Sequence, residues 1–136
     1  VGVRVQRSVR PGERRKESMS DRDLIEACAK AAGLSIARNR QAERDQMIGR
    51  ENARLWIVGG SIAWSPVDDD ADAFRLAVDL KLKIEHEQDH KGWYTVAWDG
   101  YFGSGKHYHD DTDRRTATRY AICTIAAQHE RKAVGA

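Results

Sequence analysis

Apolar side chains recur at helical spacing, at positions i, i+3, i+4 and i+7, in three parts of this chain. In the first part, from about residue 21 to 32, they form one stripe of Leu24, Ala27, Cys28 and Ala31. Ser20 precedes the stripe as an N-cap residue, and Asp23 can return a hydrogen bond to it. Gly33 supplies the left-handed residue that commonly ends a helix. This pattern predicts a helix over residues 21–32.

A second helix is predicted after a strand-like run that ends with Trp64, whose side chain we expect to close over the core. Pro66 stops that run, and Asp68 or Asp69 caps the helix that follows. The helix has a wide apolar face made of Ala73, Phe74, Leu76, Ala77, Val78 and Leu80. A face of this width predicts packing against the sheet and a neighbouring helix together.

A third helix, from about residue 114 to 130, follows the acidic turn 110–113. Short runs with strand propensity lie between the helices, at residues 55–58, 61–64, 83–88, 93–98 and 106–109. Gly59 and Gly60 separate the first two runs, a spacing typical of a tight hairpin. Residues 39–54 are rich in Arg, Glu and Gln, and their pattern leaves both a polar loop and a weakly held helix open.

The order of these elements favours one fold class. Helices and strands do not alternate regularly, which argues against a doubly wound parallel sheet. The strand runs are short and closely spaced, as hairpin connections require. We therefore predict an α+β fold, in which an antiparallel sheet of about four to five short strands carries three helices on its faces, similar to an α-β-α sandwich.

Three segments together resemble a family of small uncharacterised phage and prophage proteins, described as a phage α-β-α sandwich domain. They are residues 21–33, residues 64–78 with the order Trp-Ser-Pro, acidic run, Ala-x-Arg-Leu-Ala, and residues 114–122. Ser65 stands where the family usually has Asn before the proline. The resemblance implies a fold and a phage origin, and it supports Met19 as the natural start. The family has no established activity that transfers to any residue.

Composition places the chain among single soluble domains. It has 136 residues, 40% of them hydrophobic and 32% charged. No apolar run reaches the roughly 20 residues that a membrane helix needs. Cys28 and Cys123 both lie in apolar helical patterns, so we interpret them as small core residues in a reducing, cytoplasmic setting. No cofactor is predicted.

Residues 1–18 differ in composition from the rest. They carry six of the 23 basic residues and two of the 21 acidic ones, and their only apolar side chains are four valines. We predict a disordered basic leader upstream of the natural start at Met19, followed by a single domain over residues 19–136. That domain carries a net charge of −2, which removes most of the reason to expect binding to nucleic acid.

Two clusters could hold a metal ion. His107 and His109 would share one face of a strand beside Asp110, with His86 or His90 as a third ligand, but an HxH pair alone is a weak signal and solvated histidines are the preferred interpretation. The carboxylates at 68–72 could gather a hard cation. Because consecutive helical residues point in different directions, helix capping is the preferred interpretation of that run.

Aromatic residues concentrate in one stretch that includes Trp93, Tyr94, Trp98 and Tyr101. Alternation along a strand puts Trp93 on one face and both Tyr94 and Trp98 on the other. Helices on both faces of the sheet would bury them all. If one face is uncovered, the same residues form a surface for a protein partner.

The sequence shows no complete catalytic set. Our first hypothesis is therefore a non-enzymatic phage or prophage accessory protein in the cytoplasm of a bacterial cell, acting through an unidentified protein partner or as a homo-oligomer. One alternative is a metal-dependent hydrolase that uses His107, His109 and a nearby aspartate. The other is nucleic-acid binding through the basic residues 1–18.

Overall fold

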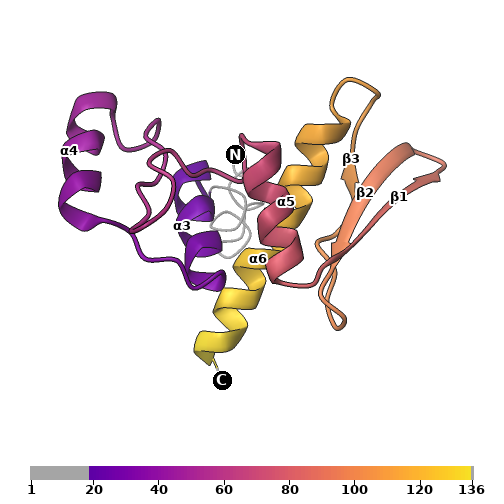
Figure 1. The fold of residues 1–136 in the computed structure, drawn as a ribbon. Coiled ribbons are helices and arrows are strands. Elements are labelled where there is room, and N and C mark those ends of the chain that lie inside the picture. The colour runs from indigo at the N-terminus through magenta and orange to yellow at the C-terminus, as the bar shows by residue number, and fades with distance from the viewer. Residues whose placement is uncertain (1–18, 136) are drawn as a thin grey trace, which may run out of the picture.

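The structure is a computed structural model that describes residues 19–135 (Figure 1). The predictions made for residues 1–18 lie outside the described residues. The elements follow the order α3 (Asp21–Ala31), α4 (Arg38–Ile48), α5 (Asp70–Asp79), β1 (Lys83–Asp89), β2 (Gly92–Trp98), β3 (His107–Tyr108) and α6 (Arg114–Gly135). No helix within residues 19–135 combines the length and the apolar character that crossing a bilayer requires.

Helix α6 lies at the centre and joins two hydrophobic clusters (Figure 1). On one side it packs against α3 and α5, where Cys28, Leu76 and Cys123 are buried. On the other side it packs against the sheet, where Ala97, Ala121 and Ile125 are fully buried. Small side chains on both flanks of α6 allow its neighbours to approach closely, so one helix supports the whole core.

The three strands form one antiparallel sheet in the order β1-β2-β3. In its register Ile84 lies opposite Ala97, Glu85 opposite Val96, and Tyr94 opposite Tyr108. Because side chains alternate between the two faces of a strand, Ile84 and Ala97 share the face that α6 covers. The strands predicted at 83–88 and 93–98 are confirmed, and the run predicted at 106–109 contains β3.

The prediction of four to five strands was wrong for the described chain. Leu55 pairs with Trp64, and Ile36 with Ile57, but only as isolated bridges outside the sheet. The chain reverses through Gly59, whose φ is 71°, as a tight turn requires. Pro66 has no N–H to continue the pairing, and the turn that leads into α5 follows directly, so the hairpin is too short to form strands.

The arrangement of helices also differs from a sandwich. The described residues form four helices, the additional one being α4, for which the sequence left both a loop and a helix open, and α6 is the helix that packs on the sheet. Helix α5 packs on α6, and its wide apolar face is only half used: Ala73 and Leu76 are buried, whereas Phe74 is 68% exposed. Since α6 covers one face of the sheet, the opposite face has no helix of the described chain over it.

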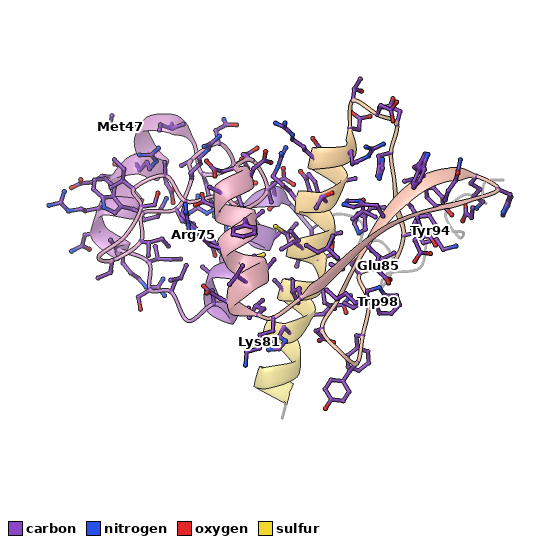
Figure 2. All side chains as sticks on the ribbon, turned by 45° about the vertical axis from the view of Figure 1, so that its right-hand side comes forward. Met47, Arg75, Lys81, Glu85, Tyr94 and Trp98 are labelled. Atoms are coloured by element: carbon purple, nitrogen blue, oxygen red, sulfur yellow. The ribbon has the colours of Figure 1, made fainter. Side chains whose placement is uncertain are left out.

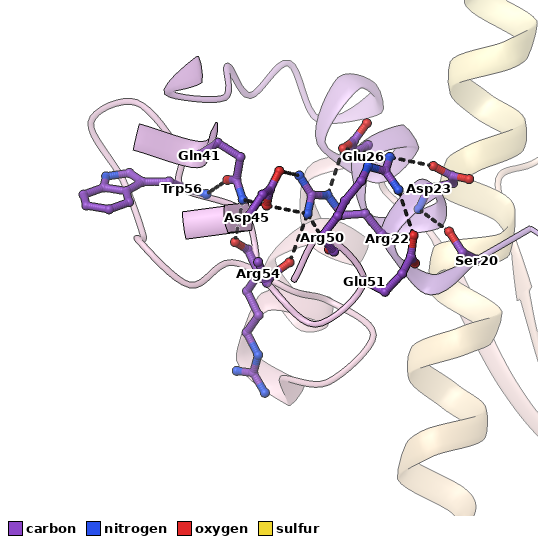
Figure 3. A network of polar contacts seen from close by, with 11 residues as sticks. Ser20, Arg22, Asp23, Glu26, Gln41, Asp45, Arg50, Glu51, Arg54 and Trp56 are labelled. Carbon is purple, nitrogen blue, oxygen red and sulfur yellow. Dashed lines mark hydrogen bonds and ion pairs between the residues drawn. The ribbon is translucent and has the colours of Figure 1, made fainter. Parts of the chain in front are cut away.

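Helix α4 is attached by polar contacts around Arg22 of α3 (Figure 3). The Arg22 side chain is only 3% exposed and donates two hydrogen bonds to the carboxylate of Asp45, at 2.9 and 3.0 Å. It also donates to Glu26 at 2.8 Å and to the carbonyl of Arg50 at 2.6 Å. The Arg22 guanidinium holds the pKa of Asp45 below its usual range.

Gln41 is the buried residue of α4, and its amide completes this attachment. Its nitrogen donates to the carbonyl of Arg54 at 3.2 Å, and its oxygen accepts from the backbone N–H of Trp56 at 2.6 Å. Residues 38–48 are therefore helical, although they present no apolar stripe. Of the two options left open for this segment, the helix is the observed one.

Candidate interaction face of the sheet

The sheet face opposite α6 carries a cluster of aromatic and charged side chains, which we call the aromatic face (Figure 2). Alternation along the strands and the observed register assign to it Lys83, Glu85, Glu87, Asp89, Tyr94, Val96, Trp98, Lys106 and Tyr108. Trp98 is 40% exposed and Tyr108 is exposed to a similar degree. Large aromatic side chains open to solvent on one continuous face are typical of a surface that contacts a partner.

Trp98 is held in one position from two sides. Its indole Nε1 donates a hydrogen bond to Glu85 at 2.9 Å, across the β1–β2 pair. Its ring lies over Gly103 so closely that a Cβ atom there would come within 2.7 Å of a ring carbon. Glycine at position 103 is thus required for this close contact, which together with the hydrogen bond to Glu85 holds the indole in one orientation.

The other aromatic pair is tied to Asp89 at the end of β1. The rings of Tyr94 and Tyr108 lie 5.6 Å apart, and the Tyr108 hydroxyl donates to Asp89 at 2.7 Å. Lys106 forms an ion pair with Asp89 at 3.0 Å and places its ammonium 4.8 Å from the centre of the Tyr94 ring. The hydrogen bonds from Tyr108 and Lys106 hold the pKa of Asp89 far below its usual range.

Between these groups the aromatic face is hollowed by a cavity of about 400 Å³. Val96 lies in its lining and is buried. Tyr94 and Trp98 contribute aromatic surface, Glu85 and Glu87 contribute carboxylates, and Lys106 contributes one ammonium group. A cationic side chain would meet ring faces and negative charge together in such a hollow. The geometry therefore suits a cationic group such as a guanidinium or an ammonium.

The aromatic residues that the sequence grouped as one partner surface do not lie on one surface in the structure. Tyr94 and Trp98 lie together on the aromatic face, whereas Trp93 lies on the other face, opposite Gln88. Tyr101, which is 82% exposed, lies in the connection after β2. Tyr108 belongs to the face but is missing from the predicted surface, although its alternation with His107 and His109 is the signal that could have found it.

The candidate metal residues do not form a three-ligand site in the described chain, although two of the histidines come together. The hydroxyl of Thr95 lies between His86 and His109, at 2.8 and 3.0 Å from one nitrogen of each ring. His107 lies opposite Thr95 in the register, and burial lowers its pKa. No group of three metal-ligating side chains occurs within the part of the chain that the structure describes.

Asp110, the carboxylate proposed to join the histidines, caps the turn before α6 instead. Its Oδ1 accepts hydrogen bonds from the backbone N–H and hydroxyl of Thr112 and from the N–H of Asp113. These bonds lower the pKa of Asp110. All of these donors belong to the turn just before α6, so Asp110 has a local structural role.

The carboxylates of the acidic run before α5 also have local structural roles. Asp69 is the N-cap of α5 and accepts from the N–H of Asp72, while Asp68 accepts from the Ser65 hydroxyl. The buried carboxylate of Asp72 accepts from the N–H of Ser65. Trp64 and Pro66 are buried beside them, so this segment closes the core around the start of α5.

Comparisons with known proteins give no significant match to this chain. No family model matches the chain, and no curated protein and no solved structure is significantly similar to it.

Proposed function

We propose that this chain is a protein-interaction domain that binds its partner through the aromatic face. The observation that carries the proposal is the one-sided sheet: α6 packs on one face, and the opposite face presents Trp98, Tyr94 and Tyr108 with no described helix over them. Trp and Tyr are the residues that most often dominate the binding energy of protein interfaces. Their fixed orientation lowers the entropy lost on binding.

The charges on the aromatic face support a partner with basic side chains. Glu85 and Glu87 line the hollow; Lys106 is already paired with Asp89 and Lys83 with Glu85, whereas Glu87 has no ion pair among the described residues. An incoming guanidinium or ammonium would therefore find carboxylates beside aromatic rings. The same acidic character opposes the phosphate backbone of a nucleic acid, which requires clustered positive charge.

The resemblance to phage and prophage proteins supports a narrower form of the proposal. In that form the domain is a non-enzymatic accessory protein that contacts a phage or host protein in the bacterial cytoplasm.

A photo-crosslinking experiment tests the aromatic face directly. A benzophenone amino acid is placed at Tyr108 on the aromatic face or at Met47 on α4, which is 84% exposed and serves as the control position. Both variants are irradiated in cells of a bacterial host. We expect one dominant crosslinked protein from position 108 that is absent from position 47.

A second substitution makes this test specific. In the position 108 background, Trp98→Ala should abolish the crosslink, and Trp98→Tyr should retain part of it because an aromatic ring remains. Equal capture from positions 108 and 47, or an unchanged crosslink in Trp98→Ala, would contradict the proposal.

A further inference from the structure

Strand β1 is an outer strand of the sheet, with β2 as its one neighbour among the described strands. On the side of β3, His109 N–H donates to the carbonyl of Trp93 and Ser104 N–H donates to the carbonyl of Ala97. The odd-numbered residues of β2 therefore direct their backbone groups toward β3, and the even-numbered residues direct theirs toward β1. Their partners on β1 are the odd-numbered residues, since Tyr94 lies opposite Glu87.

The even-numbered residues of β1 consequently point their backbone groups away from the sheet. These residues are Ile84, His86 and Gln88, and none of them has a backbone partner outside the sheet among the described residues. A row of N–H and C=O groups with this spacing is what an added strand requires.

A groove runs beside this edge on the face of the sheet that α6 covers. It encloses about 670 Å³, with α6 as its floor, β1 as one wall and α5 as the other. Its apolar lining comes from Ala73, Phe74 and Ala77 of α5, Ile84 of β1 and Ile122 of α6. The exposed half of the α5 face, including Phe74, therefore borders this groove.

We propose that an extended segment of the partner protein adds to the edge of β1 as a fourth strand, with alternate apolar side chains in this groove. The proposal rests on the proposed function and specifies how the partner chain is held. Backbone hydrogen bonds to residues 84, 86 and 88 supply the pairing, and the groove beside Ile84 and Phe74 receives the side chains that point toward α6.

The charges of β1 on the aromatic face specify which side chains fit on that side of the added strand. On the aromatic face, β1 presents Glu85, Glu87 and Asp89 against the single cation of Lys83. Side chains of an added strand that lie opposite these carboxylates contact them directly, and like charges there are destabilising. The segment that fits therefore alternates apolar residues with lysine or arginine.

A second copy of this chain fits the edge less well. A two-fold pairing of β1 with β1 of another copy would bring the α5 of that copy to the same face of the joined sheet. That space is the groove, and α5 of the first copy already forms the wall of the groove opposite Ile84. The α5 helices of the two copies would therefore compete for it. The groove thus admits a single strand more readily than the edge of a folded domain.

Synthetic peptides of about nine residues, a common strand length, test the proposal. A fluorescent peptide that alternates valine with lysine is titrated with the full chain at low salt, and anisotropy is measured. We expect saturable binding that weakens with salt, at least about tenfold weaker binding of a valine–glutamate peptide, and none of a valine–lysine peptide N-methylated at alternate residues. No binding of the valine–lysine peptide, or equal binding of all three, would overturn the proposal.

A matched pair of variants locates the site. Gln88→Pro removes one outward N–H, which an edge strand tolerates, whereas Gln88→Ala keeps it. We expect Gln88→Pro to weaken the peptide about tenfold and Gln88→Ala to leave it within about twofold, with unchanged melting temperatures for both proteins. Equal affinities of the two variants would overturn the proposal, as would a monomer–dimer equilibrium that the peptide does not disturb.

The same variants separate this inference from the proposed function. If Gln88→Pro retains the crosslink from position 108 and Trp98→Ala abolishes it, the aromatic face is the binding surface and strand addition is wrong. If neither substitution changes the crosslink, both proposals fail.

Discussion

Helix α4 and the β-sheet lie at opposite ends of the molecule (Figure 1), and they are attached to it in opposite ways. The sheet rests on α6 through Ile84, Ala97 and Ile125, which are apolar and largely buried. Helix α4 contributes Gln41 as its buried residue and depends on Arg22 and its hydrogen bonds. Apolar burial is non-directional and tolerates small shifts, whereas a buried arginine depends on every partner being in place.

This difference predicts different kinds of failure. Loss of an apolar contact beneath the sheet should lower the stability of the whole domain, because α6 joins both clusters. Loss of the arginine network should release α4 locally, since few apolar contacts hold that helix.

The largest effect is expected for Ile125→Ala, which removes a fully buried side chain between α6 and the sheet. The free energy of unfolding should fall by about 4 kcal/mol, because a cavity remains where the methyl groups were. Urea denaturation followed by circular dichroism measures the change. The loss should be global, so hydrogen exchange should accelerate in α3 as well as in the sheet.

Arg22→Ala should cost about 3 kcal/mol locally, because Asp45 and two backbone carbonyls lose a buried donor. Amide exchange should accelerate across residues 38–54 while the protection of β2 stays near that of the unchanged protein. Arg50→Ala is the matched control, since Arg50 pairs with Asp23 and Glu51 at the exposed surface, where an ion pair adds little. Uniform acceleration in all elements would contradict a local attachment.

Gly103→Ala should cost about 1 to 2 kcal/mol, because the added Cβ meets the Trp98 ring and forces it to move. Tryptophan fluorescence should shift as the indole leaves Glu85, and the crosslink from position 108 should weaken. Gly105→Ala provides a comparison without a steric clash, since a Cβ atom there meets no atom within 4 Å. Its effect comes from a φ of 84° alone.

The smallest effect concerns pH. Burial lowers the pKa of His107, and burial together with His109 and Arg114 lowers the pKa of His86. Below about pH 6.5 the unfolded chain therefore binds more protons than the folded chain, and stability should fall as the pH falls through this window. Urea midpoints at pH 5 and 7.5 measure the slope, and His107→Asn should reduce it. A slope that stays unchanged would assign the pH dependence to other groups.

Several elements could be predicted because their signals are local. Ser20 caps α3 by accepting from the N–H of Asp23, and Asp69 caps α5, each within one turn of the chain. Alternation along residues 93–98 correctly separates Trp93 from Tyr94 and Trp98. Such patterns depend on neighbouring residues, so they can be read before the fold is known.

Other features depend on residues far apart in the sequence. Arg22 supports α4 through Asp45, 23 positions away, so the composition of residues 39–54 alone could not decide between a loop and a helix. Thr95 brings His86 and His109 together, although the sequence suggested His107 as the partner of His109. Each of these pairings depends on sheet register and helix packing, which local spacing does not encode.

The sequence by itself determined the segments that form α3, α5, α6, β1 and β2, the N-caps of α3 and α5, and which residues of β2 share a face. Only the tertiary structure decided that α6 covers one face of the sheet, that Phe74 borders an open groove, and that β1 is an edge. The physical reason is that periodicity shows which side of an element is apolar, but not which neighbour covers it or whether any neighbour does. The proposed binding surfaces are the sides of the sheet that this packing left open.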